Sequence, residues 1–167
     1  MKSRFFAVLL IGLLGAGAAF AQSGAQKEFA KLKTLAGEWR GRDSHEHAVQ
    51  VSFRVISQGS ALLSEIAATQ EHGNMVTLFH LDGDRLLATH YCTAGNQPRM
   101  RATISPDGTT LTFDFLDATN LAPGQPGHMQ RLVIALLGPD HHTEEWHFTH
   151  GDGREEIELD DLRRVGP

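Results

Sequence analysis

The chain has 167 residues, of which 41% are hydrophobic and 21% are charged, and its formal net charge is −5 at pH 7. An acidic chain without a basic patch is not suited to binding nucleic acid or an anionic membrane surface. Its single cysteine, Cys92, also excludes an intramolecular disulfide framework.

The first 21 residues have the features of a secretory signal peptide. Lys2 and Arg4 form a short positive region, and an apolar run follows from Phe5 to Leu14. Ala19-Phe20-Ala21 then gives the small-x-small pattern at which signal peptidase cleaves. We therefore expect a secreted protein, periplasmic in a Gram-negative cell, with one domain over residues 22–167 and no membrane insertion after cleavage.

The pattern of apolar residues predicts one helix followed by strands. Residues 24–36 place Phe29, Leu32 and Leu35 at near-helical spacing, which indicates a short amphipathic helix. After Gly37 the hydrophobic period changes to two. Residues 47–55 are typical of a half-buried strand, with one face formed by Val49, Val51, Phe53 and Val55.

Turn motifs divide the rest of the chain into segments of similar length. Residues 82–84 and 106–109 favour tight hairpins, and the stretch 117–127, rich in proline and glycine, predicts a longer loop. From Trp39 onward we count about ten strands and no second helical pattern. The sequence thus predicts an all-β, up-and-down antiparallel barrel of about ten strands with a short N-terminal helix, since closure removes exposed edges and leaves room for a small ligand.

The stretch LKTLAGEWRGR, in which a helix leads into Gly37-x-Trp39, resembles the opening of calycins. That group contains lipocalins, fatty-acid-binding proteins and nitrobindin-like heme barrels. The resemblance implies a small-molecule-binding barrel in which Trp39 closes the floor and a basic residue of the last strand packs across it. Arg163 or Arg164 could take this part, and we assign it to Arg163. The sequence also resembles exported bacterial proteins with a Trp-Arg-Gly start and a THYC…NQPRM centre, a family that implies no established reaction.

Residues 89–100, THYCTAGNQPRM, gather unlike polar side chains around one turn. Strand alternation places His90 and Cys92 on one face of the preceding strand but does not decide whether that face is internal. A few polar groups fixed by strands at a barrel mouth are typical of a ligand site, and an arginine there could pair with a carboxylate or phosphate. The alternative is an ordinary turn whose polar groups satisfy the backbone. The ligand-binding residues predicted in this segment are His90, Asn96, Gln97, Arg99 and Met100.

Two residues from other strands complete the predicted ligand site. Glu65 shares a strand face with Ala61 and Leu63, and inside a barrel it would need a partner such as Arg99. An outward position for Glu65 fits the pattern equally well. The remaining predicted contact is Trp146. The side chains expected to line or close the cavity are Val51, Phe53, Phe79, Phe113 and Trp146.

The ten histidines suggest a metal site as an alternative. His45 and His47 have the two-residue spacing that zinc and copper sites use on strands, and together with His147 they are the metal candidates. The resemblance to heme barrels implies an axial histidine, for which His147 or His90 is best placed. Surface histidines without a common focus are the simpler interpretation.

The sequence contains none of the standard catalytic motifs. It has no Gly-x-Ser-x-Gly elbow, phosphate-binding loop or Cys-x-x-Cys pair in residues 22–167, so we assign no reaction. We predict a barrel that carries or senses a small apolar or amphipathic molecule with a polar or anionic end. The alternatives are a metal- or heme-binding barrel and a filled barrel that docks a protein partner.

Overall fold

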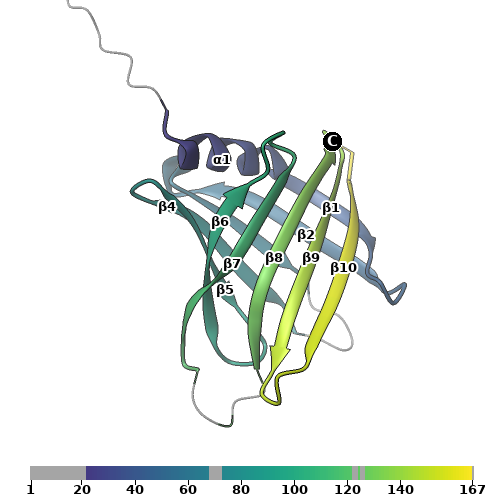
Figure 1. Cartoon of the computed structure of the whole chain (residues 1–167). Helices are drawn as coiled ribbons and strands as arrows, with labels where there is room; N and C mark the ends of the chain where they lie inside the picture. The colour runs from purple at the N-terminus through teal and green to yellow at the C-terminus, as the bar shows by residue number, and fades with distance from the viewer. Residues whose placement is uncertain (1–21, 68–72, 122–123, 125–126, 167) are drawn as a thin grey trace, which may run out of the picture.

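A computed structural model describes residues 22–67, 73–121, 124 and 127–166. The expected signal peptide, residues 1–21, lies outside the described residues. Figure 1 shows a barrel of strands with a helix across one end. The strands are β1 (Gly37–Arg42), β2 (Ala48–Ile56), β3 (Ala61–Ile66), β4 (Met75–Asp82), β5 (Arg85–Tyr91), β6 (Gln97–Ile104), β7 (Thr110–Thr119), β8 (Gly127–Gly138), β9 (His141–His150) and β10 (Glu155–Arg164).

The helix α1 (Gly24–Leu32) continues as a 3-10 turn over Lys33–Leu35, which confirms the helix predicted at 24–36. It begins at Ser23, whose side chain accepts a hydrogen bond from the backbone of Gln26 while the Gln26 side chain accepts one from the Ser23 backbone. Phe29 and Leu32 face the barrel and join its core. Within the described part of the chain, no helix has the length and apolar character of a membrane span.

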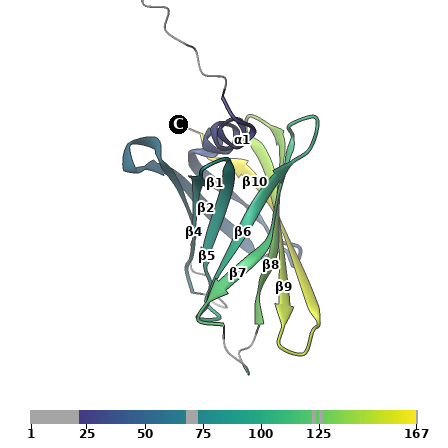
Figure 2. The same ribbon diagram turned by 60° about the vertical axis from the view of Figure 1, so that its left-hand side comes forward.

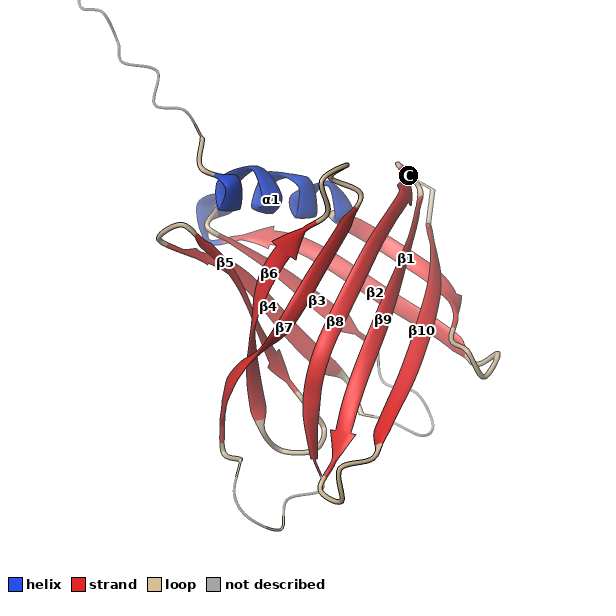
Figure 3. Ribbon diagram, in the orientation of Figure 1, coloured by secondary structure: helices blue, strands red, loops and turns tan. Residues whose placement is uncertain are grey.

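The ten strands form a closed antiparallel barrel, in which each strand pairs with its neighbours in the chain and β1 pairs with β10. Figures 2 and 3 show the closed wall from two directions. The hairpins predicted at 82–84 and 106–109 both form, joining β4 to β5 and β6 to β7. The predicted fold class is therefore confirmed.

Strand alternation holds for most of the predicted strand at 47–55 but fails at its end. Val49, Val51 and Phe53 are buried, whereas Val55 is 44% exposed. Val55 lies beside the 3-10 turn Ser57–Gly59, where β2 ends. The two-residue pattern therefore identified the strand correctly but extended its buried face too far.

The half of the barrel under α1 is filled with side chains. Phe79 and Phe113 pack with their ring centroids 5.2 Å apart, and Phe53 is also buried in this core. Phe29 and Leu32 of the helix belong to the same cluster. The side chains that were expected to line a cavity, Val51, Phe53, Phe79 and Phe113, are therefore core residues in one cluster with Phe29 and Leu32 of the helix.

Trp39 is buried at the helix end of the barrel, where its Nε1 donates a hydrogen bond to the Leu35 carbonyl, and the basic residue packed on it is Arg164 instead of Arg163. The Arg164 guanidinium lies 4.3 Å from the Trp39 ring centre and donates hydrogen bonds to the backbone carbonyls of Thr34 and Ala36. The Arg163 side chain is 66% exposed on the outer face. Because alternate residues of β10 face inward, only one of the two neighbouring arginines can reach Trp39.

Candidate functional site

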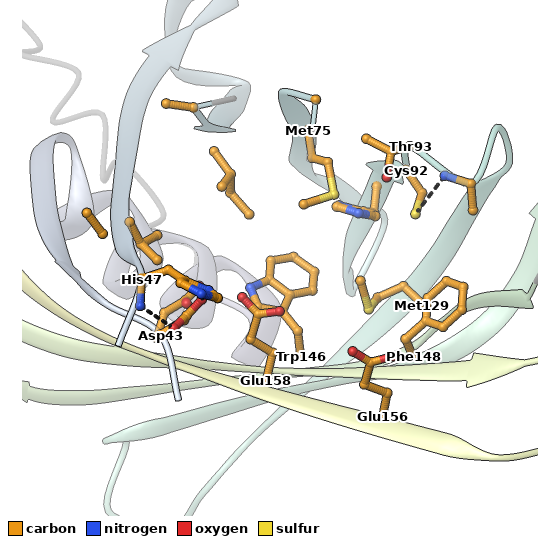
Figure 4. A pocket seen from close by; sticks show the side chains of 18 of the residues that line it. Asp43, His47, Met75, Cys92, Thr93, Met129, Trp146, Phe148, Glu156 and Glu158 are labelled. Carbon is orange, nitrogen blue, oxygen red and sulfur yellow. Dashed lines mark hydrogen bonds and ion pairs between the residues drawn. The ribbon is translucent and has the colours of Figure 1, made fainter. Parts of the chain in front are cut away.

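The half of the barrel opposite α1 contains a cavity of about 650 Å³. Its walls come from the β1–β2 connection, the ends of β3 and β5, and the inner faces of β8, β9 and β10. Figure 4 shows the lining side chains pointing toward a common space. The barrel is thus filled at one end and hollow at the other.

One side of this cavity is apolar and flexible in shape. Met75 of β4 faces Trp146 of β9 across the space (Figure 4). Met129 of β8 lies beside its strand partner Phe148, and Ile66 of β3 pairs with Met75. Methionine side chains adapt to ligands of irregular shape, and aromatic rings supply large contact areas. This side can therefore hold the body of an organic molecule.

The wall next to Trp146 and Phe148 carries carboxylates, because β10 pairs with β9. Glu156, Glu158 and Asp160 occupy alternate positions of β10 and face inward, and Asp43 adds a fourth carboxylate from the β1–β2 connection. Figure 4 shows the Glu156 and Glu158 carboxylates below Phe148 and Trp146. Two histidines lie among these groups: His47 contacts Asp43, and His150 contacts Glu156. The described lining contains no lysine or arginine.

Asp160 is the most deeply buried of these four carboxylates. It is 2% exposed, and its Oδ1 atom has no hydrogen-bond partner. Burial, together with repulsion from Glu144, Glu158 and Asp43, raises the pKa of Asp160 to about 8. The carboxyl group therefore holds its proton at neutral pH, since two neighbouring negative charges in a poorly hydrated site repel each other.

Glu144 lies next to Asp160 across the β9–β10 pair and is also buried. Its Oε1 lies 3.1 Å from His142 Nε2, and its Oε2 accepts a hydrogen bond of 3.2 Å from Trp146 Nε1. These contacts compensate Glu144 for the loss of water. They also fix the orientation of Trp146, so that its ring presents a defined surface to the cavity.

His90 also lines the cavity and is fully buried. Its Nδ1 lies 2.9 Å from Thr77 Oγ1, its Nε2 has no partner, and its ring centroid lies 4.9 Å from that of Trp146. Burial lowers the pKa of His90 to about 4, so the ring is neutral at physiological pH. The inward face of β5 is therefore the one that carries His90, and Cys92, which follows the strand, also lines the cavity.

Two of the residues in the predicted ligand site, His90 and Trp146, line the cavity. Met100 is buried in the core and does not reach the cavity. Asn96 is buried as well, and its Nδ2 donates a hydrogen bond of 2.7 Å to the carbonyl of Gly127. Asn96 thus attaches the β5–β6 turn to the start of β8, which is a structural contact.

The three other predicted ligand contacts lie on the outside of the barrel. Arg99 forms an exposed ion pair with Asp117, with 2.6 Å between Nε and Oδ1, and Gln97 accepts a hydrogen bond from Thr119. Glu65 alternates with the buried Leu62 and Ser64 of β3 and therefore faces outward. The expected Glu65–Arg99 pair does not form, because both side chains have the outward parity on their strands.

The metal candidates lie on different faces of the barrel wall. His47 lines the cavity and contacts Asp43, and its ring lies 6.0 Å from that of His45. His147 faces outward, where its two ring nitrogens lie 2.7 and 2.8 Å from Glu145 and Glu155. The described residues contain no group of three or more His, Cys, Asp or Glu side chains that could hold a metal ion.

The inward carboxylates of β10 were not among the site residues predicted from the sequence. Ile157 and Leu159 alternate with them and would be expected to face inward, yet they are 49% and 40% exposed. The direction in which each β10 side chain points could have been inferred from its pairing with the buried Trp39 of β1. If the arginine that packs on Trp39 is Arg164, then every even residue of β10 faces the interior, and Asp160 is among them.

The architecture defines the class of this protein, a closed ten-stranded antiparallel barrel with a helix over one end. Sixteen chains of solved structures match it. One is the crystal structure of Rv2717c from M. tuberculosis, with a TM-score of 0.58 and 15% sequence identity over 83% of this chain and 98% of that chain. At that identity the match shows a shared fold. A scan against protein-family models found no match, and a search of curated proteins found none either.

The resemblance to heme barrels raises the question of whether this cavity fits heme. Heme carries two negatively charged propionates, whereas the charged wall of the cavity is formed by carboxylates with no lysine or arginine among the described lining residues. The neutral His90 is suitable in its chemistry, but it is fully buried against Trp146. The residues of the cavity therefore do not fit heme.

Proposed function

We propose that this protein binds a small, largely apolar molecule in the open half of its barrel. The observation that carries the proposal is the 650 Å³ cavity, which lies directly beyond a half of the barrel that is fully packed. Ligand sites in proteins have volumes of this size and combine apolar walls with a few fixed polar groups. Export to the periplasm, indicated by residues 1–21, forms part of the same proposal, as a carrier or sensor.

The apolar side of the cavity would hold the body of the ligand. Trp146 and Phe148 offer ring faces, and Met75 and Met129 adjust to its outline. The sequence predicted a polar or anionic end on the ligand, with Arg99 as the partner for an anionic group. Arg99 lies outside and the charged groups of the cavity are acidic, so we no longer expect an anionic ligand.

The proposal is tested with N-phenyl-1-naphthylamine, an uncharged probe whose fluorescence rises in apolar surroundings. We expect saturable binding to residues 22–167. A double variant, Ile66→Trp with Met75→Trp, places two large rings in the cavity at paired positions of β3 and β4 and should weaken binding by about tenfold or more. The matched control is Glu65→Trp with Val76→Trp, the adjacent pair on the outer face.

The control variant should bind the probe as the unmodified protein does. Equal loss of binding in both double variants, with the barrel still folded by circular dichroism, would place the probe outside the cavity. Absence of probe binding to the unmodified protein would contradict the proposal and would favour a barrel that docks a partner through its outer surface.

A further inference from the structure

The cavity lining contains a buried histidine that lacks one of its two hydrogen bonds. His90 of β5 lines the cavity and is fully buried. Its Nδ1 lies 2.9 Å from the Thr77 hydroxyl, whereas its Nε2 has no partner. A buried polar atom without a partner costs free energy, and most such atoms in proteins are satisfied. A ligand in the cavity could supply the missing partner.

The lining contains a second unpartnered polar atom, on Asp160 of β10. This residue is 2% exposed, and its Oδ1 has no hydrogen-bond partner. Burial lowers the pKa of His90 to about 4, and burial together with neighbouring carboxylates raises the pKa of Asp160 to about 8. Both groups are therefore uncharged at neutral pH. A ligand that hydrogen-bonds to either of them needs no charge of its own.

The charged side chains of the lining interact within the protein. Asp43 contacts His47, and Glu156 contacts His150. Glu158 has an interaction partner in the protein as well. The described lining offers no lysine or arginine for an anion. An ionic end group would lose its hydration in this cavity without gaining a dedicated counter-charge, so the lining favours an uncharged polar group.

The contact between His90 and Thr77 determines what Nε2 can bind. If the Thr77 hydroxyl donates to Nδ1, Nε2 carries the proton and donates; if Nδ1 donates to Thr77, Nε2 accepts. A hydroxyl group is a suitable partner in both cases, because it both donates and accepts. An ether or a ketone only accepts, and a hydrocarbon does neither.

A small polar group can approach His90 from the cavity. Met75 lies two residues before Thr77 on the inward face of β4 and lines the same space (Figure 4). Methionine side chains change their shape easily, so a movement of Met75 can admit a single oxygen atom. The Trp146 ring, with its centroid 4.9 Å from that of His90, provides an apolar contact for the adjoining carbon skeleton.

We propose that the ligand of this cavity is an uncharged alcohol, whose apolar body lies against Trp146 and whose hydroxyl group hydrogen-bonds to His90 Nε2. This inference rests on the proposed function and specifies its ligand class. His90 determines specificity for the polar end of the ligand, and the apolar wall supplies most of the contact area.

The first test uses four competitors of nearly identical size, each of which displaces the bound probe N-phenyl-1-naphthylamine. At pH 7, 4-phenylbutanol and pentylbenzene are neutral, 4-phenylbutylamine is positive and 4-phenylbutanoate is negative. We expect the alcohol to compete about tenfold more strongly than either ion, because the ions lose their hydration. Pentylbenzene has no polar group and therefore measures the apolar contribution alone.

Three variants test the assignment to His90. His90→Phe keeps a planar ring without nitrogen atoms, so the affinity for 4-phenylbutanol relative to pentylbenzene should fall by about tenfold. His90→Gln retains a hydrogen-bonding group near the position of Nε2 and should retain most of this ratio. His128→Phe makes the same substitution on the outer face of β8 and should leave the ratio unchanged. The affinity for pentylbenzene reports whether each variant keeps an intact cavity.

A measurement on the unmodified protein tests the same contact without a substitution, and it decides the matter if His90→Phe does not fold. In protein labelled with nitrogen-15 at histidine, the His90 Nε2 resonance should shift when 4-phenylbutanol binds. Pentylbenzene should shift it much less, because it offers no hydrogen bond. Equal shifts with both compounds would contradict the contact.

The outcomes distinguish this inference from the proposed function. If the probe binds and the amine or the carboxylate competes as well as the alcohol, the ligand class is wrong and the binding function stands. If His90→Phe and His128→Phe leave the same ratio of alcohol to hydrocarbon affinity, the assignment to His90 fails. If the probe does not bind at all, the proposed function itself fails.

Discussion

The buried carboxyl of Asp160 makes a testable contribution to the pH dependence of stability. Glu144 faces it from β9, Glu158 from its own strand and Asp43 from the β1–β2 connection, while His142 and His47 contact Glu144 and Asp43. Replacing Asp160 with Asn keeps a side chain of similar shape and removes the titrating group. The variant should therefore lose one specific component of the pH dependence.

The sign of this component follows from the raised pKa. The ordinary pKa of an aspartate is 3.8, and in the folded protein that of Asp160 is about 8. Between these values the folded protein retains a proton that the unfolded chain has released, so the free energy of unfolding decreases as the pH rises. Each pH unit in the window contributes about 1.4 kcal/mol, which gives roughly 4 kcal/mol between pH 5 and pH 8.

The measurement is guanidinium-induced unfolding followed by circular dichroism at these two pH values. We expect Asp160→Asn to gain stability relative to the unmodified protein on going from pH 5 to pH 8, by about 4 kcal/mol. Asp161→Asn, the exposed neighbour, should not show this gain. A change of less than about 1 kcal/mol for Asp160→Asn would refute the account of Asp160 as a carboxyl that is protonated in the folded state at neutral pH.

Two further predictions concern the closure of the barrel. Arg164→Ala removes the contact with Trp39 and several hydrogen bonds to backbone carbonyls. It should therefore lower the free energy of unfolding by about 2–3 kcal/mol. Arg163→Ala, at the exposed neighbouring position, should change the free energy of unfolding by less than about 0.5 kcal/mol in the same denaturation assay. Gly41→Ala should cost about 3 kcal/mol or prevent folding, because the added Cβ would lie 1.7 Å from the Asp161 carbonyl oxygen where β1 meets β10. Gly138→Ala, with open space around it, is its control, and similar unfolding temperatures for the two alanine variants would contradict the close approach at Gly41.

The fold could be predicted because its signals are local. The spacing of Phe29, Leu32 and Leu35 identified the helix, and alternation together with Asp-Gly turns identified the strands and their antiparallel order. The parity of each strand was harder to predict. On β10 the apolar Ile157 and Leu159 face outward and the acidic residues face inward, which is the reverse of the usual preference.

The site depended on relations between distant segments. His90 and Trp146 were predicted as contacts and do line the cavity, but Arg99 and Glu65, also predicted as ligand contacts, lie on the outside of the barrel. A mixed strand face carries no local signal for its direction, because both parities satisfy the same turns. The sequence spacing predicts which residues of one strand share a face. It does not predict that Asp43 lies near Asp160, because that proximity depends on the pairing of β1 with β10 in the closed barrel.

By itself, the sequence determined a single helix and a series of antiparallel strands, because periodicity and turn chemistry act over a few residues. Only the tertiary structure decided which side chains share the interior. Closure of β1 on β10 fixed Arg164 on Trp39, and that register turned Glu156, Glu158 and Asp160 toward the cavity. The packing of α1 then filled one half of the barrel and left the other half open, since a helix of three turns covers only one end.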